Sequence, residues 1–196
     1  MRIKLVGLVF LGIALLFGLG ACKSTKSYEK AAKATVIDLP LSSKEYWTDR
    51  DYFRAVQSGK SPDLATSKKI ALHNAKSELA GNIQSTLKRV TEQFTNQRSI
   101  INGQEYANEF NELAREEVNR QLNVVKIIGD KLMREKDGSY IYFIAIEMSK
   151  ENLLNQISDK VSKDAKLQLE FDKQQFKKIF DEEMKKLEEE SGYWIK

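Results

Sequence analysis

The chain has few of the residues on which most catalytic and metal sites depend. Its 196 residues include one cysteine, one histidine and two prolines. One histidine and one cysteine are too few for a usual zinc ligand set, and a single thiol cannot close a disulfide within the chain. No G-x-S-x-G, H-E-x-x-H, Walker or dinucleotide-binding pattern follows the first 21 residues. The sequence therefore predicts a protein that is not an enzyme and that uses no metal or cofactor.

An excess of one charge sign is also lacking. The chain carries 32 basic and 28 acidic residues, and the two kinds alternate without forming a stripe of one sign. Nucleic-acid-binding surfaces need such a stripe, so we expect no nucleic-acid partner. The hydrophobic fraction of 41% is enough for a real core.

The amino terminus has the pattern of a lipoprotein signal. Arg2 and Lys4 precede an apolar stretch of 15 residues, 5–19, which is short for a membrane span. The segment Leu19-Gly-Ala-Cys22 then resembles a bacterial lipobox, and Cys22 is the only thiol. We predict that residues 1–21 are a signal peptide and that Cys22 carries diacylglycerol and an acyl chain such as palmitate. The alternative is an ordinary signal peptide followed by a buried cysteine.

The segment after Cys22 is predicted to be a tether, residues 22–45. It is rich in lysine, serine and alanine, with a small apolar island at Val36, Ile37, Leu39 and Leu41 around Pro40. That island is a candidate extra strand at a sheet edge, since proline is confined to edges. Lys23 stands where an aspartate favours inner-membrane retention in well-studied sorting systems. We expect an outer-membrane protein that faces the periplasm.

The predicted domain, residues 46–150, begins with a strand, a capped turn and a long helix. Tyr52–Val56 reads as a short strand that Ser58 and Gly59 end. Ser61 is the expected N-cap of a helix from Pro62 to about Asn96. Apolar residues recur along that helix with the spacing of one buried face, at Ala71, Ala75, Leu79, Ile83, Leu87, Val90 and Phe94.

A second helix, about 105–121, and a β-hairpin follow. Residues 122–128 and 131–133 are strand-like, and Gly129 between them predicts a bulge. The segment 136–139 is a hairpin turn, and residues 140–146 are the strongest strand. Both faces of that strand are apolar. We expect one face to pack on the first helix and the other to be covered by the C-terminal helix or by another subunit.

The predictions give an α+β fold, β-α-α-β-β-α, with long helices on a small antiparallel sheet. Residues 151–196 form the last helix, with Ser149 as its N-cap. No glycine or proline interrupts residues 139–191. An unbroken helix of this length would exceed the domain's width, so it either projects, folds back near residues 172–174, or pairs with a partner.

A few residues merit consideration as sites. His73 is expected on the surface, since it faces away from the apolar stripe. Asp49 and Asp51 lack the loop pattern of a calcium site, and Asp63 and Glu78 are explained by helix capping and a solvated face. Four clustered aromatic residues, Tyr46, Trp47, Tyr52 and Phe53, either fill the core edge or form a ligand-stacking platform.

These motifs resemble the twenty-kilodalton bacterial membrane-lipoprotein (LPP) family. The resemblance covers residues 46–150 and rests on Tyr52–Val56, Ser58-Gly59, Ser61–Asp63, Ala71–Ala80 and Asp137–Phe143. The family domain is similar to the amino-terminal domain of the flagellar T-ring protein. The resemblance implies a compact α+β domain, an outer-membrane lipoprotein and no enzymatic activity, and it carries over no site residues.

Two functions remain open at this level. The first is a lipid-anchored structural or protein-interaction module that binds another envelope protein or itself. The second is a binding module for a small or lipidic ligand between sheet and helices, with Tyr140, Tyr142 and the Tyr46/Trp47 pair as its lining.

Overall fold

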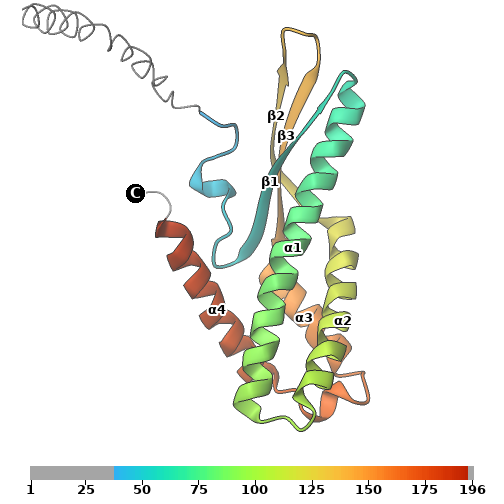
Figure 1. The fold of residues 1–196 in the computed structure, drawn as a ribbon, viewed down its shortest axis with the longest axis vertical. Helices are drawn as coiled ribbons and strands as arrows, with labels where there is room; N and C mark the ends of the chain where they lie inside the picture. Colours follow the sequence, from blue (N-terminus) through green and yellow to red (C-terminus); the bar gives the residue numbers. More distant parts are fainter. Residues whose placement is uncertain (1–37, 194–196) are drawn as a thin grey trace, which may run out of the picture. The chain divides into compact units, whose positions relative to one another are not determined.

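A three-stranded sheet and four α-helices make up residues 38–193, the part of the chain that the computed structural model describes (Figure 1). The order is β1 (Tyr52–Ser61), α1 (Leu64–Arg98), α2 (Gly103–Gln121), β2 (Lys126–Arg134), β3 (Tyr140–Ser149), α3 (Lys150–Val161) and α4 (Lys173–Tyr193). Short 3₁₀ turns, η1 (Lys44–Tyr46), η2 (Leu122–Val124) and η3 (Leu167–Leu169), join them. The α+β class is as predicted, with one helix more at the end.

The sheet is antiparallel with the order β1-β3-β2. Its central strand is the last in sequence, and Val56 lies opposite Ala145 while Lys131 lies opposite Phe143. The register of β2 shifts between Ile127 and Gly129, which confirms the predicted bulge. At the hairpin, Gly138 has a φ of 85°, and the Glu135 N–H donates to the Ser139 carbonyl oxygen. The turn chemistry was therefore also predicted correctly.

Strand β1 is longer than predicted, because Ser58 and Gly59 do not end it. Its pairing with β3 continues to Ser61. A Cβ placed on Gly59 would lie 2.4 Å from the Ser67 carbonyl oxygen and 2.5 Å from the Ala71 nitrogen. Gly59 is thus where the α1 backbone approaches the sheet, and its function is close contact, not strand termination.

The first helix begins two residues later than predicted and has a different cap. The Asp63 carboxylate accepts the Thr66 backbone N–H at 2.7 Å, while Ser61 is still in β1. Asp63 therefore replaces Ser61 as N-cap. The predicted apolar stripe of α1 is fully buried, from Ala71 to Phe94.

Helix α1 packs against one face of the sheet, here called the inner face. Its buried side chains are Phe53, Ala55, Tyr142, Ile144, Ile146 and Met148. The opposite, outer face carries Arg54, Val56, Ile141, Phe143, Ala145 and Glu147, in register with one another. The predicted packing on the first helix thus belongs to the Tyr142 and Ile144 side of β3.

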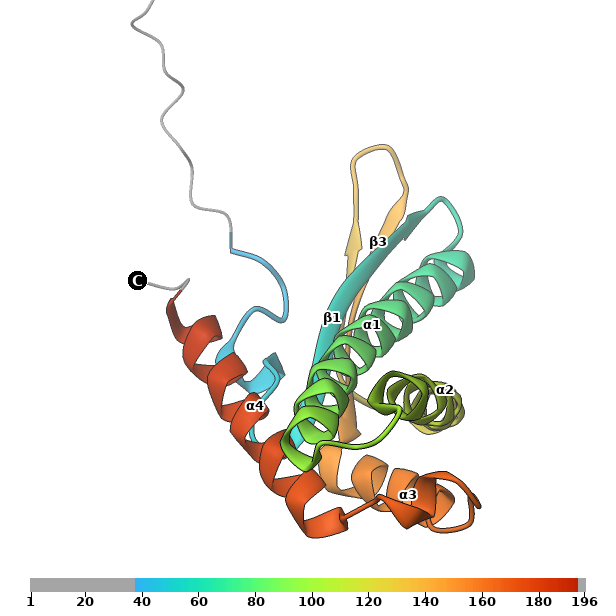
Figure 2. The same ribbon diagram turned by 60° about the horizontal axis from the view of Figure 1, so that its bottom comes forward.

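The C-terminal region folds back, because it consists of two helices with a turn between them (Figure 2). Asp164 accepts backbone N–H groups of Lys166 and Leu167, and Asp172 accepts those of Gln174 and Gln175. The Asp172 carboxylate therefore opens α4 as a cap. Helix α4 packs on α1 and does not cover the outer face of the sheet, so the first of the two predicted covers, the C-terminal helix, is wrong. Its buried side chains are Phe176, Ile179, Phe180 and Met184.

The start of the described chain is not a strand. Residues 38–43 include a turn with Leu41 at a φ of 58°, and Leu39 is 61% exposed. The predicted edge strand is therefore wrong for Leu39 and Leu41. Val36 and Ile37 lie outside the described residues, as do Cys22 and the predicted signal peptide.

Candidate interaction surface

The outer face of the sheet has a charged end near Glu147. This carboxylate is only 7% exposed, and it accepts the Arg54 Nε–H at 3.1 Å and the Lys126 Nζ–H at 3.0 Å. Arg54 also pairs with Asp49. Burial opposes ionisation of Asp49, but hydrogen bonds from Arg54 and from the Tyr52 and Asp51 backbones hold its pKa below the ordinary value. These satisfied charges stabilise the end of the sheet where the chain enters the domain.

The middle of the outer face is covered by Tyr46. A Cβ on Gly129 would lie 2.7 Å from the Tyr46 Cε1 atom, so the ring rests directly on the strand. Ala145, which pairs with Gly129 in the sheet, is fully buried. Because Gly129 has no side chain, the aromatic ring of Tyr46 in η1 can pack directly on the backbone at the bulge.

The distal part of the outer face is open and apolar. Val56, Ile141 and Phe143 are half-buried, and Met133 on the neighbouring strand is 45% exposed. Lys60, which lies opposite Ile141 on β1, pairs with Glu135 just beyond the end of β2. We call Val56, Ile141, Phe143 and Met133 the distal patch. Contiguous apolar side chains on a sheet surface are typical of interaction sites.

The two edges of the sheet also differ in whether other parts of the chain bind their outward backbone groups. At the β1 edge, the Thr48 hydroxyl accepts the Arg54 N–H at 2.9 Å and donates to the Arg54 carbonyl at 3.2 Å. The Asn74 side chain donates to the Ser58 carbonyl at 3.0 Å. Within residues 38–193, no comparable side chain or loop binds the outward groups of β2. Within the described chain, the sheet is thus closed at Arg54 and Ser58 of β1 and open along β2.

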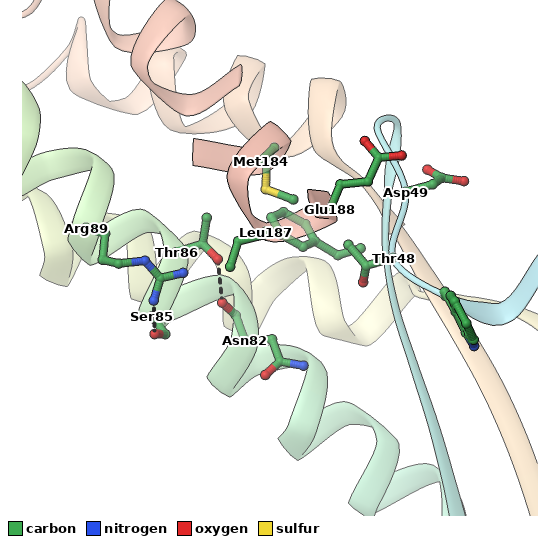
Figure 3. Close-up of a pocket in the computed structure, with 11 residues that line it drawn as sticks. Thr48, Asp49, Asn82, Ser85, Thr86, Arg89, Met184, Leu187 and Glu188 are labelled. Carbon is green, nitrogen blue, oxygen red and sulfur yellow. Dashed lines mark hydrogen bonds between the residues drawn. The ribbon is translucent and has the colours of Figure 1, made fainter. Parts of the chain in front are cut away.

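A groove between α1, α4 and residues 47–49 is the other candidate site (Figure 3). Its volume is about 590 Å³. Arg89 pairs with the buried Glu183 and donates to Ser85, so its charge is committed within the protein. The apolar part of the wall is formed by Trp47, Phe53, Met184 and Leu187, and the polar part includes Asp49, Asn82, Thr86 and Glu188.

A buried lysine lies beside this groove. Lys150 is 3% exposed, donates through Nζ to the Asp49 carbonyl oxygen and lies 4.8 Å from the centre of the Phe53 ring. Burial lowers its pKa to about 8, against the opposing effect of Asp49, Glu188 and Asp51. Its backbone N–H also donates to the Asp51 carbonyl. Lys150 therefore ties the entering chain to the junction of β3 and α3.

The residues named for a ligand site do not converge. Tyr142 lies on the inner face, where its hydroxyl donates to Asp130 at 2.6 Å and Lys68 sits 5.0 Å from its ring centre. Tyr46 is on the outer face, and Trp47 lines the groove. Tyr140 lies beside Arg134 near the hairpin. A pocket shared by the four is thus not what the structure forms from these residues.

The remaining predicted roles are structural. Phe53 is in the core and Tyr52 packs against Arg54. His73 is exposed, as predicted. Asp49 accepts backbone N–H groups of Asp51 and Tyr52, and Glu78 accepts from Gln57 at the surface. Among residues 38–193, no group of three histidine, cysteine or acidic side chains is arranged to hold a metal ion.

Sequence reasoning missed the residues that distinguish the two sides of the sheet. These residues are Thr48, Asn74, Glu147 and Lys150. No role was predicted for them, and their partners lie far away in sequence or on another element. The one available signal was the pair of apolar faces on β3, which predicted a side in need of cover.

Comparisons with protein-family models, curated proteins and solved structures find no match for this chain. Within the described part of the chain, none of the helices is both long and apolar enough to cross a bilayer.

Proposed function

We propose that this protein is a non-enzymatic envelope lipoprotein, anchored by lipid on Cys22, that binds another protein through the open side of its sheet. The observation that carries the proposal is the distal patch, which lies beside a sheet edge that no other segment of residues 38–193 pairs with. A half-exposed apolar row flanked by Lys60 and Lys131 has the mixed character of a protein interface. The lipobox supports the anchor, and Lys23 supports an outer-membrane site that faces the periplasm.

Membership in the LPP family is part of the same proposal. It is supported by the motifs at Tyr52–Val56 and Asp137–Phe143, which form β1 and the β2–β3 hairpin. The family's non-enzymatic character agrees with the roles of Asp63 and Asp172, which cap helices, and of Glu147, which forms ion pairs.

The anchor is tested by replacing Cys22. Wild-type protein is expected in the membrane fraction with the mass of attached lipid, and Cys22→Ala is expected to lose both. Several acyl chains bind far more firmly than one, since each buried methylene contributes about 0.8 kcal/mol. A Cys22→Ala protein that keeps its lipid mass would contradict the lipidation site.

The interaction surface is tested with a photo-reactive amino acid at Phe143 in the anchored protein. We expect cross-linked protein at this position and none at His73, which is exposed on α1 away from the core. Equal cross-linking at both positions, or at neither, would contradict a role for the distal patch.

The second candidate function is capture of a small amphiphile in the groove of α1 and α4. Its volume of about 590 Å³ and its apolar wall favour this reading. Trp47 reports on it directly. A change in Trp47 fluorescence on adding a single-chain detergent below its micelle concentration, lost in Met184→Glu, would support it.

A further inference from the structure

Strand β2 presents hydrogen-bonding groups that nothing in the described chain uses. Because Glu135 pairs with Ser139 and hydrogen-bonded pairs alternate along an antiparallel ladder, the backbone groups of Asp130, Leu132 and Arg134 point away from β3. The same alternation places Arg54 and Ser58 outward on β1, which are the residues that Thr48 and Asn74 bind. The two edges thus have equivalent groups. At β1 both backbone groups of Arg54 and the carbonyl of Ser58 have partners, whereas none of the three β2 residues has one within the described chain.

The open edge is also accessible. Asp130, Leu132 and Arg134 are exposed, with Leu132 at 46%. In both views of the ribbon, β2 lies on the side of β3 away from α1 (Figures 1 and 2). Exposed edges of this kind are normally protected by charge, a bulge or a covering segment, since they can pair with another strand. Here the bulge lies between Ile127 and Gly129, just before these three residues, and the pairing from Asp130 to Arg134 continues without a further shift.

The sequence of this edge is complementary to itself. If two copies pair antiparallel about a two-fold axis at Leu132, Leu132 faces its own copy and Asp130 faces Arg134 twice. All three positions have outward backbone groups, so each opposed pair is a hydrogen-bonded one. Opposite charges directly across a strand pair stabilise it, and apolar pairs do the same.

Other registers fit less well. A pairing centred on Asp130 places Asp130 against itself and Lys126 against Arg134, and a pairing centred on Lys131 opposes two lysines. A pairing centred on Met133 opposes only Met133 to itself and Leu132 to Arg134 within the strands, because β2 ends at Arg134.

We propose that the partner of the open edge is a second copy of this chain, joined through β2 in a continuous six-stranded sheet with Leu132 on the two-fold axis. This inference rests on the proposed function, because it names the partner of the same open side of the sheet. Pairing at the edge brings the distal patches of both copies onto one surface. The dimer therefore has a larger continuous outer face than a single copy.

Cysteine substitution tests the register in the intact lipoprotein in its membrane. Cys22 is the only native cysteine, so lipidation leaves no competing thiol. Under mild oxidation, Leu132→Cys is expected to form a covalent dimer. Lys131→Cys and Met133→Cys, one position away on either side, are expected to lag behind it. Asp130→Cys and Arg134→Cys should cross-link when mixed and not when alone. Dimers that form equally at 131, 132 and 133 would overturn the register.

Charge reversal tests the pairing without a covalent bond. A chain that starts at Lys23 keeps every buried residue of the described domain, so it serves for sedimentation in solution. Arg134→Asp is expected to raise the dissociation constant roughly tenfold, since it creates two like-charge pairs. Asp130→Arg combined with Arg134→Asp should restore dimerisation toward the wild-type level, which a folding defect would not do.

The outcomes separate this inference from the proposed function. If Leu132→Cys fails to cross-link while the probe at Phe143 still captures a different protein, the homodimer is wrong and the interaction module stands. If the charge-reversed pair does not recover, the register is wrong. If neither edge nor patch contacts any protein, both proposals fail.

Discussion

The two edges of this sheet differ in whether their outward backbone groups have hydrogen-bond partners within the described chain. At β1, Thr48 and Asn74 replace the missing strand, and Gly59 lets α1 lie directly against the backbone. At β2, the outward groups of Asp130, Leu132 and Arg134 have no such substitute within residues 38–193. Both edges have the same backbone chemistry, so the difference lies entirely in what the rest of the chain brings to them. The closed edge serves stability, and the open one is available for recognition.

The largest expected effect comes from filling the close approach at the closed edge. Gly59→Ala should lower the free energy of unfolding by about 3 kcal/mol, because the added methyl meets backbone atoms that cannot move aside. Gly81→Ala is the matched control. Gly81 is exposed in α1 with nothing within 4 Å of an added Cβ, so alanine there should stabilise by about 1 kcal/mol. Urea denaturation of both variants decides the question, and equal effects would refute the role of Gly59.

The next largest effect is a pH dependence of the free energy of unfolding, caused by Lys150. Its pKa is about 8 in the folded protein, below the ordinary 10.5 of the unfolded chain. Between these values the unfolded chain binds more protons, so the free energy of unfolding should rise by about 2 kcal/mol from pH 8 to 10. Lys150→Met should abolish this rise, as measured by urea denaturation at each pH.

Two tyrosines set the highest pH at which the effect of Lys150 on the free energy of unfolding can be measured alone. The hydrogen bond to Asp130 raises the pKa of Tyr142 to about 12, and burial raises that of Tyr106 to about 12. Their effect has the opposite sign and begins above pH 10, where tyrosines of the unfolded chain ionise. A slope that persists in Lys150→Met below pH 10 would show that another group causes it.

A smaller effect is expected from opening the closed edge. Thr48→Val keeps the shape of the side chain but removes the hydroxyl that serves both backbone groups of Arg54. We expect a loss of about 1 kcal/mol and faster amide exchange at Arg54. Thr48→Ser retains the hydroxyl and should behave like the wild type. Exchange at Leu132, on the other edge of the sheet, should be the same in all three proteins.

The smallest effect on stability is expected at Gly129, where the neighbouring group is the Tyr46 side chain and not backbone. An alanine at Gly129 would press on the Tyr46 ring, which can rotate away, so stability should change by only about 0.5 kcal/mol. The ring should nevertheless leave the outer face, which ring-proton NMR of Tyr46 can show. A loss as large as that of Gly59→Ala would mean that η1 is held as rigidly as α1.

Local signals in the sequence predicted the elements but not the edges. The bulge at Gly129, the turn at Gly138 and the stripe of α1 follow from glycine conformation and helical periodicity within a few residues. Ser61 and Asp63 are both good caps, so the choice between them depended on how far β1 pairs with β3. That pairing is long-range, and nothing near Ser61 encodes it.

The same limit explains the other errors. Both faces of β3 are apolar, so alternation could not say that the side of Tyr142 and Ile144 packs on α1. The end of α3 carries no glycine or proline, and the reversal depends on backbone hydrogen bonds to Asp164 and Asp172. Of the candidate sites, the need to cover one face of β3 was foreseen. The buried charges of Glu147 and Lys150 were not, since their partners come from residues 49–54 and 126.

The strand order has a consequence for how the protein is made. Strand β3 is central in the sheet yet follows β1, α1, α2 and β2 in the chain. While the chain is being synthesised, β1 and α1 are complete long before the strand that joins β1 to β2 exists. Such distant pairings form slowly, because the intervening chain must first be ordered. The three-stranded sheet cannot form until Ser149 has been synthesised. A chain exported during its synthesis would therefore cross the membrane before this domain has folded.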